Sequence, residues 1–119
     1  MNLKKVKEIL KAEVLCLEEK LEKEILYVGA TDLMSDALCL LEANSLLLTG
    51  LATLQVIRTA EILDLAGVVF VRGKIPSQDV IEVAKKSGIP LLTTKYPMYE
   101  ACGKLYIAGF QGKKVDFDI

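Results

Sequence analysis

Residues 67–94, GVVFVRGKIPSQDVIEVAKKSGIPLLTT, decide the fold of this chain. Two short apolar runs, 67–71 and 89–92, flank a segment with helical spacing. Apolar runs without alternation are typical of strands that are buried on both faces. Two such strands joined by a helix form a βαβ unit, so this stretch predicts a parallel sheet covered by helices.

The helix expected between these strands carries signals at both ends. Ser77 is a candidate N-cap, and Asp79 places a negative charge at the positive end of the helix dipole. Lys85 and Lys86 fall in the last turn, and Gly88 occupies the left-handed position that ends many helices.

The same alternation of apolar runs and helical periods continues outward from this stretch. It predicts an α/β fold, a mainly parallel sheet of about five short strands with helices on both faces. In the second expected helix, which begins at Thr31 or Asp32, the spacing of the apolar residues predicts a broad buried stripe: Leu33, Met34, Ala37, Leu38 and Leu41. Strands are expected at 13–17, 25–29, 45–50, 68–71 and 89–93, and the other helices at 3–10, 53–65, after Ser77 and after Pro97.

Length and composition indicate one folded domain. The chain has 119 residues, 52% of them hydrophobic and 26% charged, which is enough to build one core. We expect an α/β domain over residues 1–108. Residues 109–119 show no clear period and are expected to form a loose tail or an arm that orders on a partner.

Charge and hydropathy exclude several classes of partner. With 15 basic and 16 acidic residues, the net charge is −1, which gives no electrostatic footprint for nucleic acid or anionic lipid. No apolar stretch approaches the ~20 residues that a membrane helix needs. We therefore expect a cytoplasmic protein that binds neither nucleic acid nor membrane.

The cysteines and the missing histidine lower the expectation of catalysis. Cys16, Cys39 and Cys102 form no CxxC pair and are expected to be reduced, mostly buried thiols. The chain contains no histidine, which removes the commonest general base and a frequent zinc ligand. We expect no catalytic residue, no cofactor and no metal.

Three loops that follow expected strands carry polar residues or glycines. The carboxyl ends of parallel strands share one edge, where ligands of open α/β sheets bind. Hydroxyls, backbone N–H groups and cations there could hold a nucleotide or another phosphorylated group. The ordinary alternative is that these residues end strands, cap helices and face water. The candidate ligand-binding residues are Thr49, Gly50, Arg72, Gly73, Lys74, Thr93, Thr94 and Lys95.

Two tyrosines near the carboxyl terminus are candidate interface residues. Tyr99 and Tyr106 are seven residues apart and therefore share a helical face, and tyrosine is enriched at interfaces. Packing in the core or at its rim is the alternative.

Thr49-Gly50, Phe70–Pro76 and Gly88–Thr94 together resemble the DRTGG domain family, over nearly the whole chain to about Tyr106. That family is similar to the N-terminal domain of HPr kinase/phosphorylase, and it also occurs between CBS repeats in regulatory pyrophosphatases. The resemblance implies a regulatory or interaction module that often pairs with itself.

The chain departs from the family where Thr49-Gly50 is followed by Leu51-Ala52, because an acidic–arginine pair is usual there. A ligand role of that pair is not carried over. The kinase activity of the similar enzyme belongs to a separate domain with a phosphate-binding loop, and no GxxxxGK[ST] occurs in this sequence.

Two hypotheses follow. The first is a non-catalytic regulatory module that forms homodimers and either senses a small anionic ligand or docks on a partner enzyme. The alternative is a small enzyme that acts on a phosphorylated metabolite through Arg72, Lys74 and Lys95. That enzyme would need a perturbed thiol or carboxyl group, for which Cys102 and Asp32 are candidates.

Overall fold

A computed structural model describes residues 1–118 and shows a five-stranded sheet in the order β1-β5-β4-β3-β2. Strands β2 to β5 are parallel, and β1 pairs antiparallel with β5. The predicted α/β class with a mainly parallel sheet is confirmed. The strands are β1 (Glu13–Cys16), β2 (Val28–Ala30), β3 (Leu46–Thr49), β4 (Gly67–Phe70) and β5 (Leu91–Thr93).

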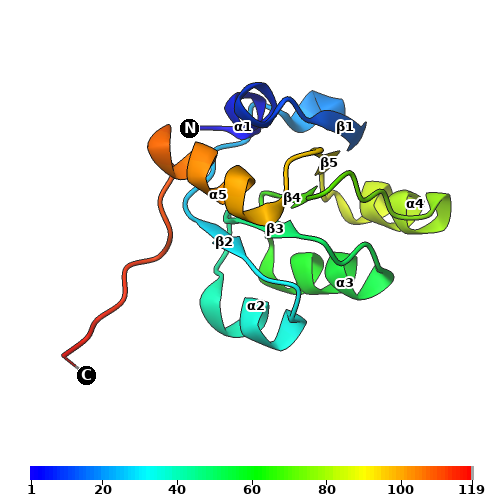
Figure 1. Cartoon of the computed structure of the whole chain (residues 1–119). Helices are drawn as coiled ribbons and strands as arrows, with labels where there is room; N and C mark the ends of the chain where they lie inside the picture. Colours follow the sequence, from blue (N-terminus) through cyan, green and yellow to red (C-terminus); the bar gives the residue numbers. More distant parts are fainter. Residues whose placement is uncertain (119) are drawn as a thin grey trace.

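Helices cover both faces of the sheet (Figure 1). Strands β2 to β5 are spatial neighbours in chain order, and right-handed crossovers therefore bring α2, α3 and α4 to the same face. The other face is covered by α1, which precedes β1, and by α5, which follows β5. The helices are α1 (Leu3–Leu10), α2 (Met34–Leu40), α3 (Leu54–Leu63), α4 (Gln78–Ser87) and α5 (Met98–Ile107), with a 3-10 turn, η1, at Glu18–Lys20.

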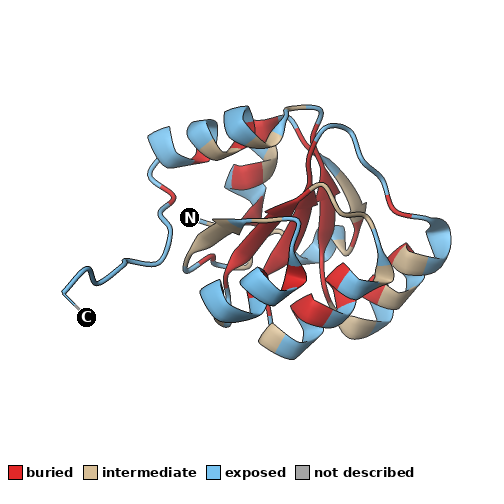
Figure 2. Ribbon diagram, turned by 60° about the horizontal axis from the view of Figure 1, so that its bottom comes forward, coloured by how far each residue is buried: buried red, intermediate tan, exposed pale blue. Residues whose placement is uncertain are grey.

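The strands lie between two apolar layers, and Figure 2 shows the central strands β3, β4 and β5 buried beneath helices whose outer surfaces are exposed. Leu47 and Phe70 pack toward α2, α3 and α4. Leu46 and Leu48 point the other way, toward α1 and α5. Because both sides of each central strand are covered, apolar residues are needed at every position, which explains the continuous runs.

The ends of α4 lie where the sequence predicts them. Ser77 occupies the N-cap position with extended backbone, although its side chain makes no capping hydrogen bond. Gly88 ends the helix in the left-handed conformation, with φ of 76°, and its N–H bonds to the Lys85 carbonyl. Residues other than glycine adopt this conformation only at a steric cost.

The predicted buried stripe of α2 is narrower than expected: Leu41 is buried as predicted, but the prediction is wrong for Leu33 and Leu38. Met34 and Ala37 are buried, but Leu33 is 58% exposed and Leu38 is 47% exposed. The reason is position: α2 packs over β2, the edge strand, so only a narrow side of this short helix contacts the sheet. The three thiols were expected to be mostly buried: Cys16 is buried and Cys102 is half-buried, but Cys39 on α2 is exposed.

The segment after α5 first packs on the domain and then leaves it. Phe110 is buried, and the Gln111 carbonyl accepts a hydrogen bond from the Val28 N–H at 3.0 Å. Lys113 forms an ion pair of 3.1 Å with Glu42, after which the chain extends outward (Figure 1). The predicted division at residue 108 stays a prediction, and residue 119 of the predicted tail lies outside the described residues.

None of the helices formed by residues 1–118 is long and apolar enough to span a membrane.

Candidate ligand-binding site

The loops after β4 and β5 diverge at the carboxyl edge of the sheet. The loop after β4 leads to α4 on one face, and the loop after β5 leads to α5 on the other face (Figure 1). Before they part, the Arg72 N–H bonds to the Tyr96 carbonyl at 2.9 Å, and the Gly73 N–H bonds to the Thr94 carbonyl at 2.8 Å. Such a divergence is the place where open parallel sheets leave a crevice for ligands.

A cavity of about 380 Å³ lies at this divergence. Its volume is in the range of small-molecule sites, about 300–1,000 Å³. The antiparallel pairing of β1 with β5 places Glu13 opposite Thr93, so the end of α1 and the start of β1 complete the wall. The lining residues are Leu10, Lys11, Glu13, Gly73, Ile75, Thr93, Thr94, Lys95 and Tyr96.

The cavity combines charged groups with apolar walls. Lys11 and Lys95 supply two exposed ammonium groups from different segments, and Glu13 supplies one carboxylate. Ile75 and the Tyr96 ring supply apolar surface, and the Lys104 ammonium lies 4.7 Å from the centroid of that ring. Cations beside an aromatic wall suit a ligand with an anionic group and a ring.

The threonine hydroxyls at the cavity serve the fold. Thr93 donates to the Lys74 carbonyl at 2.7 Å, and Thr94 donates to the Leu10 carbonyl at 2.7 Å. Thr94 also accepts a bond of 3.3 Å from the Tyr96 N–H. These side chains therefore hold three wall segments together, which agrees with the alternative role given to them from the sequence.

Four of the eight predicted ligand residues, Gly73, Thr93, Thr94 and Lys95, line the cavity, and the others do not. Thr49 and Gly50 gather instead around Asp32, whose Oδ1 accepts from the Thr49 hydroxyl at 3.0 Å and from the Gly50 N–H at 2.6 Å. Arg72 lies against Gly50, where an added Cβ would be 2.8 Å from a guanidinium nitrogen. Lys74 contributes its carbonyl to Thr93, and its side chain is exposed.

Five lining residues escaped the sequence analysis. Leu10, Lys11 and Glu13 lie about eighty residues before the loop that they face, as the Leu10–Thr94 separation of 84 positions shows. No local period predicts that β1 adds to the sheet beside β5. Ile75 and Tyr96 do adjoin the predicted loop residues, so their positions in the sequence were the available signal.

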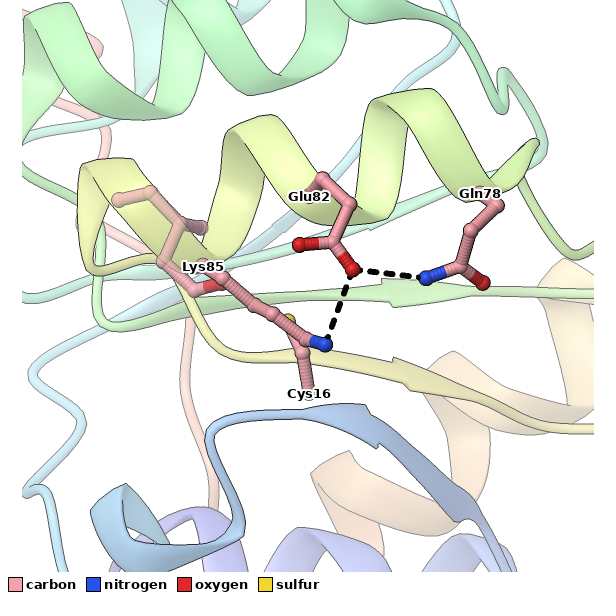
Figure 3. Close-up of polar contacts among 5 residues, drawn as sticks. Cys16, Gln78, Glu82 and Lys85 are labelled. Atoms are coloured by element: carbon pink, nitrogen blue, oxygen red, sulfur yellow. Dashed lines mark hydrogen bonds and ion pairs between the residues drawn. The ribbon is translucent and has the colours of Figure 1, made fainter.

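Groups with shifted pKa values lie away from the cavity. On α4, hydrogen bonds from Lys85 at 3.1 Å and Gln78 at 2.9 Å lower the pKa of the Glu82 carboxyl (Figure 3). Burial raises the pKa of the Cys16 thiol, drawn in the same figure, and of the Cys102 thiol.

No three histidine, cysteine, aspartate or glutamate side chains within residues 1–118 come together as metal ligands would.

Comparison with known proteins gives a family match and a structural neighbour. The family model described as the DRTGG domain matches residues 5–106. The crystal structure of the CBS and DRTGG domains of the regulatory region of a Clostridium perfringens pyrophosphatase, complexed with the activator diadenosine tetraphosphate, superimposes with a TM-score of 0.74 at 20% identity. The likeness covers 87% of this chain and 45% of that chain. Comparison with curated proteins gives no match.

Proposed function

Because this chain belongs to the DRTGG domain family, we propose that it is a non-catalytic regulatory module that senses a small anionic ligand, a nucleotide or another phosphorylated compound. The ligand would occupy the cavity between the loops after β4 and β5. We also propose that the module forms homodimers. A cytoplasmic location and docking on a partner enzyme stay predictions.

The observation that carries this proposal is the convergence of Lys11 and Lys95 on one cavity. They come from opposite ends of the chain and meet through the pairing of β1 with β5. Two ammonium groups beside a hydrophobic wall would bind a phosphoryl group while the Tyr96 ring contacts a base or another apolar part. Glu13 can accept hydrogen bonds from ligand hydroxyl or amino groups.

The structural neighbour suggests which ligand class to test first. The region that it represents is regulatory and was crystallised with a dinucleotide activator. Where that activator binds does not transfer to this chain, because the likeness covers less than half of the neighbour and identity is 20%. The activator of this neighbour is a reason to test adenine nucleotides first.

The experiment is a thermal-shift screen with mono-, di- and triphosphates of nucleosides, dinucleoside polyphosphates and phosphorylated sugars, followed by calorimetric titration of each hit. A ligand that binds only the native state raises the melting temperature. Lys95→Ala and Lys11→Ala are expected to weaken binding about tenfold each, because each removes one charge-assisted hydrogen bond.

Lys114→Ala, in the exposed segment after α5, is the matched control and leaves affinity unchanged. The proposal fails if no compound of the panel stabilises the protein. It also fails if the two cavity variants bind a hit as tightly as the wild type does.

The alternative of a small phosphate-handling enzyme receives less support from the geometry. It requires Arg72, Lys74 and Lys95 to act together, but only Lys95 lines the cavity, and Arg72 lies against Gly50. Steady conversion of any hit from the panel, detected by phosphate release or chromatography, would favour the enzyme over the sensor.

A further inference from the structure

Helix α5 is apolar on two opposite sides. Its inner side packs Ala101 and Leu105 on the sheet, and both are buried. On its outer side Tyr99 is 87% exposed, Tyr106 is 71% exposed and Ile107 is 88% exposed. Large aromatic and aliphatic side chains that gather on one exposed side of a helix are typical of an interaction surface.

Gly103 lies in the middle of this outer side. With 3.6 residues per turn, it falls between Tyr99, Tyr106 and Ile107 and points away from Ala101 and Leu105. A Cβ added at Gly103 would meet no atom within 4 Å other than those of its two chain neighbours and the backbone of α5 itself. Glycine is a poor helix former, and no contact within residues 1–118 requires the absence of a side chain here. A second helix crossing at short distance does require it, because side chains set the separation of packed helices.

We propose that two copies of this chain associate through α5, with the two helices antiparallel and crossing at Gly103. We call this arrangement the α5 crossing. It rests on the proposed self-association and specifies the surface. A two-fold axis through Gly103 makes the contact self-complementary, as in most homodimers.

The α5 crossing pairs residues of complementary chemistry. When two antiparallel helices cross at Gly103, the residue four positions before Gly103 in one copy lies beside the residue four positions after Gly103 in the other copy. Tyr99 therefore meets Ile107 of the second copy, an aromatic–aliphatic contact. Glu100 similarly meets Tyr106, whose hydroxyl can donate to the carboxylate. The two Glu100 carboxylates lie at opposite ends and do not repel each other closely.

The remaining charge on α5 lies beside the crossing. The Lys104 ammonium is held 4.7 Å from the centroid of the Tyr96 ring in the same chain. This contact draws the ammonium toward the start of the helix and away from the Tyr99, Gly103 and Tyr106 side. The centre of the surface is therefore uncharged, as the centres of protein interfaces are.

The exposed tyrosines of α5 supply part of the area that a specific dimer needs. The two exposed tyrosine side chains together offer on the order of 300 Å² to a partner. Ile107 and the flanking parts of α5 add to it, toward the about 800 Å² per partner of a standard interface.

Sedimentation velocity over a range of concentrations, without ligand, tests the α5 crossing. Gly103→Gln keeps a good helix former but fills the crossing point, and it is expected to raise the dimer dissociation constant at least tenfold. Tyr99→Ala is expected to do the same. Ile62→Ala, which truncates an exposed apolar residue of α3 on the other face of the molecule, leaves the constant unchanged.

A cross-link gives an independent readout. In a background in which Cys39 and Cys102 are both replaced by serine, Gly103→Cys places two thiols on the axis, where a disulfide needs Cα atoms closer than about 7 Å. Mild oxidation is expected to give a covalent dimer, whereas Ile62→Cys in the same background stays monomeric on denaturing gels.

A wild-type monomer at all concentrations overturns both the homodimer and the α5 crossing. A wild-type dimer that Gly103→Gln and Tyr99→Ala leave intact overturns the α5 crossing alone. Calorimetry on Gly103→Gln with a nucleotide hit separates this from ligand sensing, because the cavity residues are unchanged in that variant.

Discussion

The Thr94 hydroxyl donates a hydrogen bond of 2.7 Å to the Leu10 carbonyl, joining two residues 84 positions apart. Leu10 is the last residue of α1, where helical carbonyls have no partner within the helix. Thr94 directly follows β5 and is buried. One side chain therefore satisfies a helix end and fixes α1 at the wall of the cavity.

Replacing Thr94 by valine keeps the shape of the side chain but leaves the Leu10 carbonyl and the Tyr96 N–H without this partner. An unsatisfied buried polar group costs about 1–3 kcal/mol. We expect Thr94→Val to lower the free energy of unfolding by that amount in urea titrations. Thr94→Ser retains the hydroxyl and is expected to lower the free energy of unfolding by less than Thr94→Val does. Equal losses would show that the hydrogen bond contributes little.

Asp32 is expected to stabilise the carboxyl edge of the sheet through its Oδ1 atom. Asp32→Ala removes the acceptor of both the Thr49 hydroxyl and the Gly50 N–H, and a loss of about 1–2 kcal/mol in unfolding free energy follows. Asp36→Ala, an exposed carboxylate of α2, is the control and should change stability by less than about 0.5 kcal/mol. The role given to Asp32 is wrong if both variants behave alike.

Two glycines are expected to respond to alanine in opposite directions. Gly88 has φ of 76°, so Gly88→Ala forces a left-handed alanine and costs about 1–2 kcal/mol. Gly103 is in the interior of α5, where Gly103→Ala gains about 1 kcal/mol of helix propensity. Chemical unfolding at low micromolar protein, where association contributes least, measures both. A stabilised Gly88→Ala would contradict the assignment of the helix end.

Stability is expected to fall at alkaline pH because of Cys16. Burial raises the pKa of this thiol in the folded state above its ordinary value of 9.0. As pH rises, the Cys16 thiol therefore loses its proton in the unfolded chain before it does so in the folded one. The contribution of this thiol to the free energy of unfolding is fully present below pH 9.0 and is lost as pH rises through the folded pKa. Urea titrations from pH 8 to 10.5 should show a shallower decline for Cys16→Ala than for the wild type.

Cys39→Ala, which removes an exposed thiol, is the control for this series and should keep the decline of the wild type. Parallel declines of the wild type and Cys16→Ala would remove Cys16 as the cause.

Sequence patterns predicted the structure correctly where the decisive interactions lie within one segment of the chain. Helix α1 spans residues 3–10 as its amphipathic period indicates, and α4 ends at Gly88, because glycine adopts the left-handed conformation without the steric cost that other residues have. The prediction for Leu33 and Leu38 was wrong because spacing along a helix shows which residues share a face, but not how much of that face a neighbour covers.

The residues of the candidate site also divide into those that the sequence could predict and those that it could not. Parallel strands must bring their following loops to one edge, so the sequence could propose Gly73, Thr93, Thr94 and Lys95. It could not separate them from Thr49 and Gly50, which surround Asp32, because that depends on where each loop turns after its strand.

The sequence by itself determined a parallel sheet between helices, because continuous apolar runs and helical periods record how each segment meets its immediate surroundings. Only the tertiary structure decided that β1 runs antiparallel beside β5 and brings Lys11 and Glu13 to Lys95. Pairing between distant segments is chosen by register and burial across the whole sheet, and no short stretch of residues contains that information.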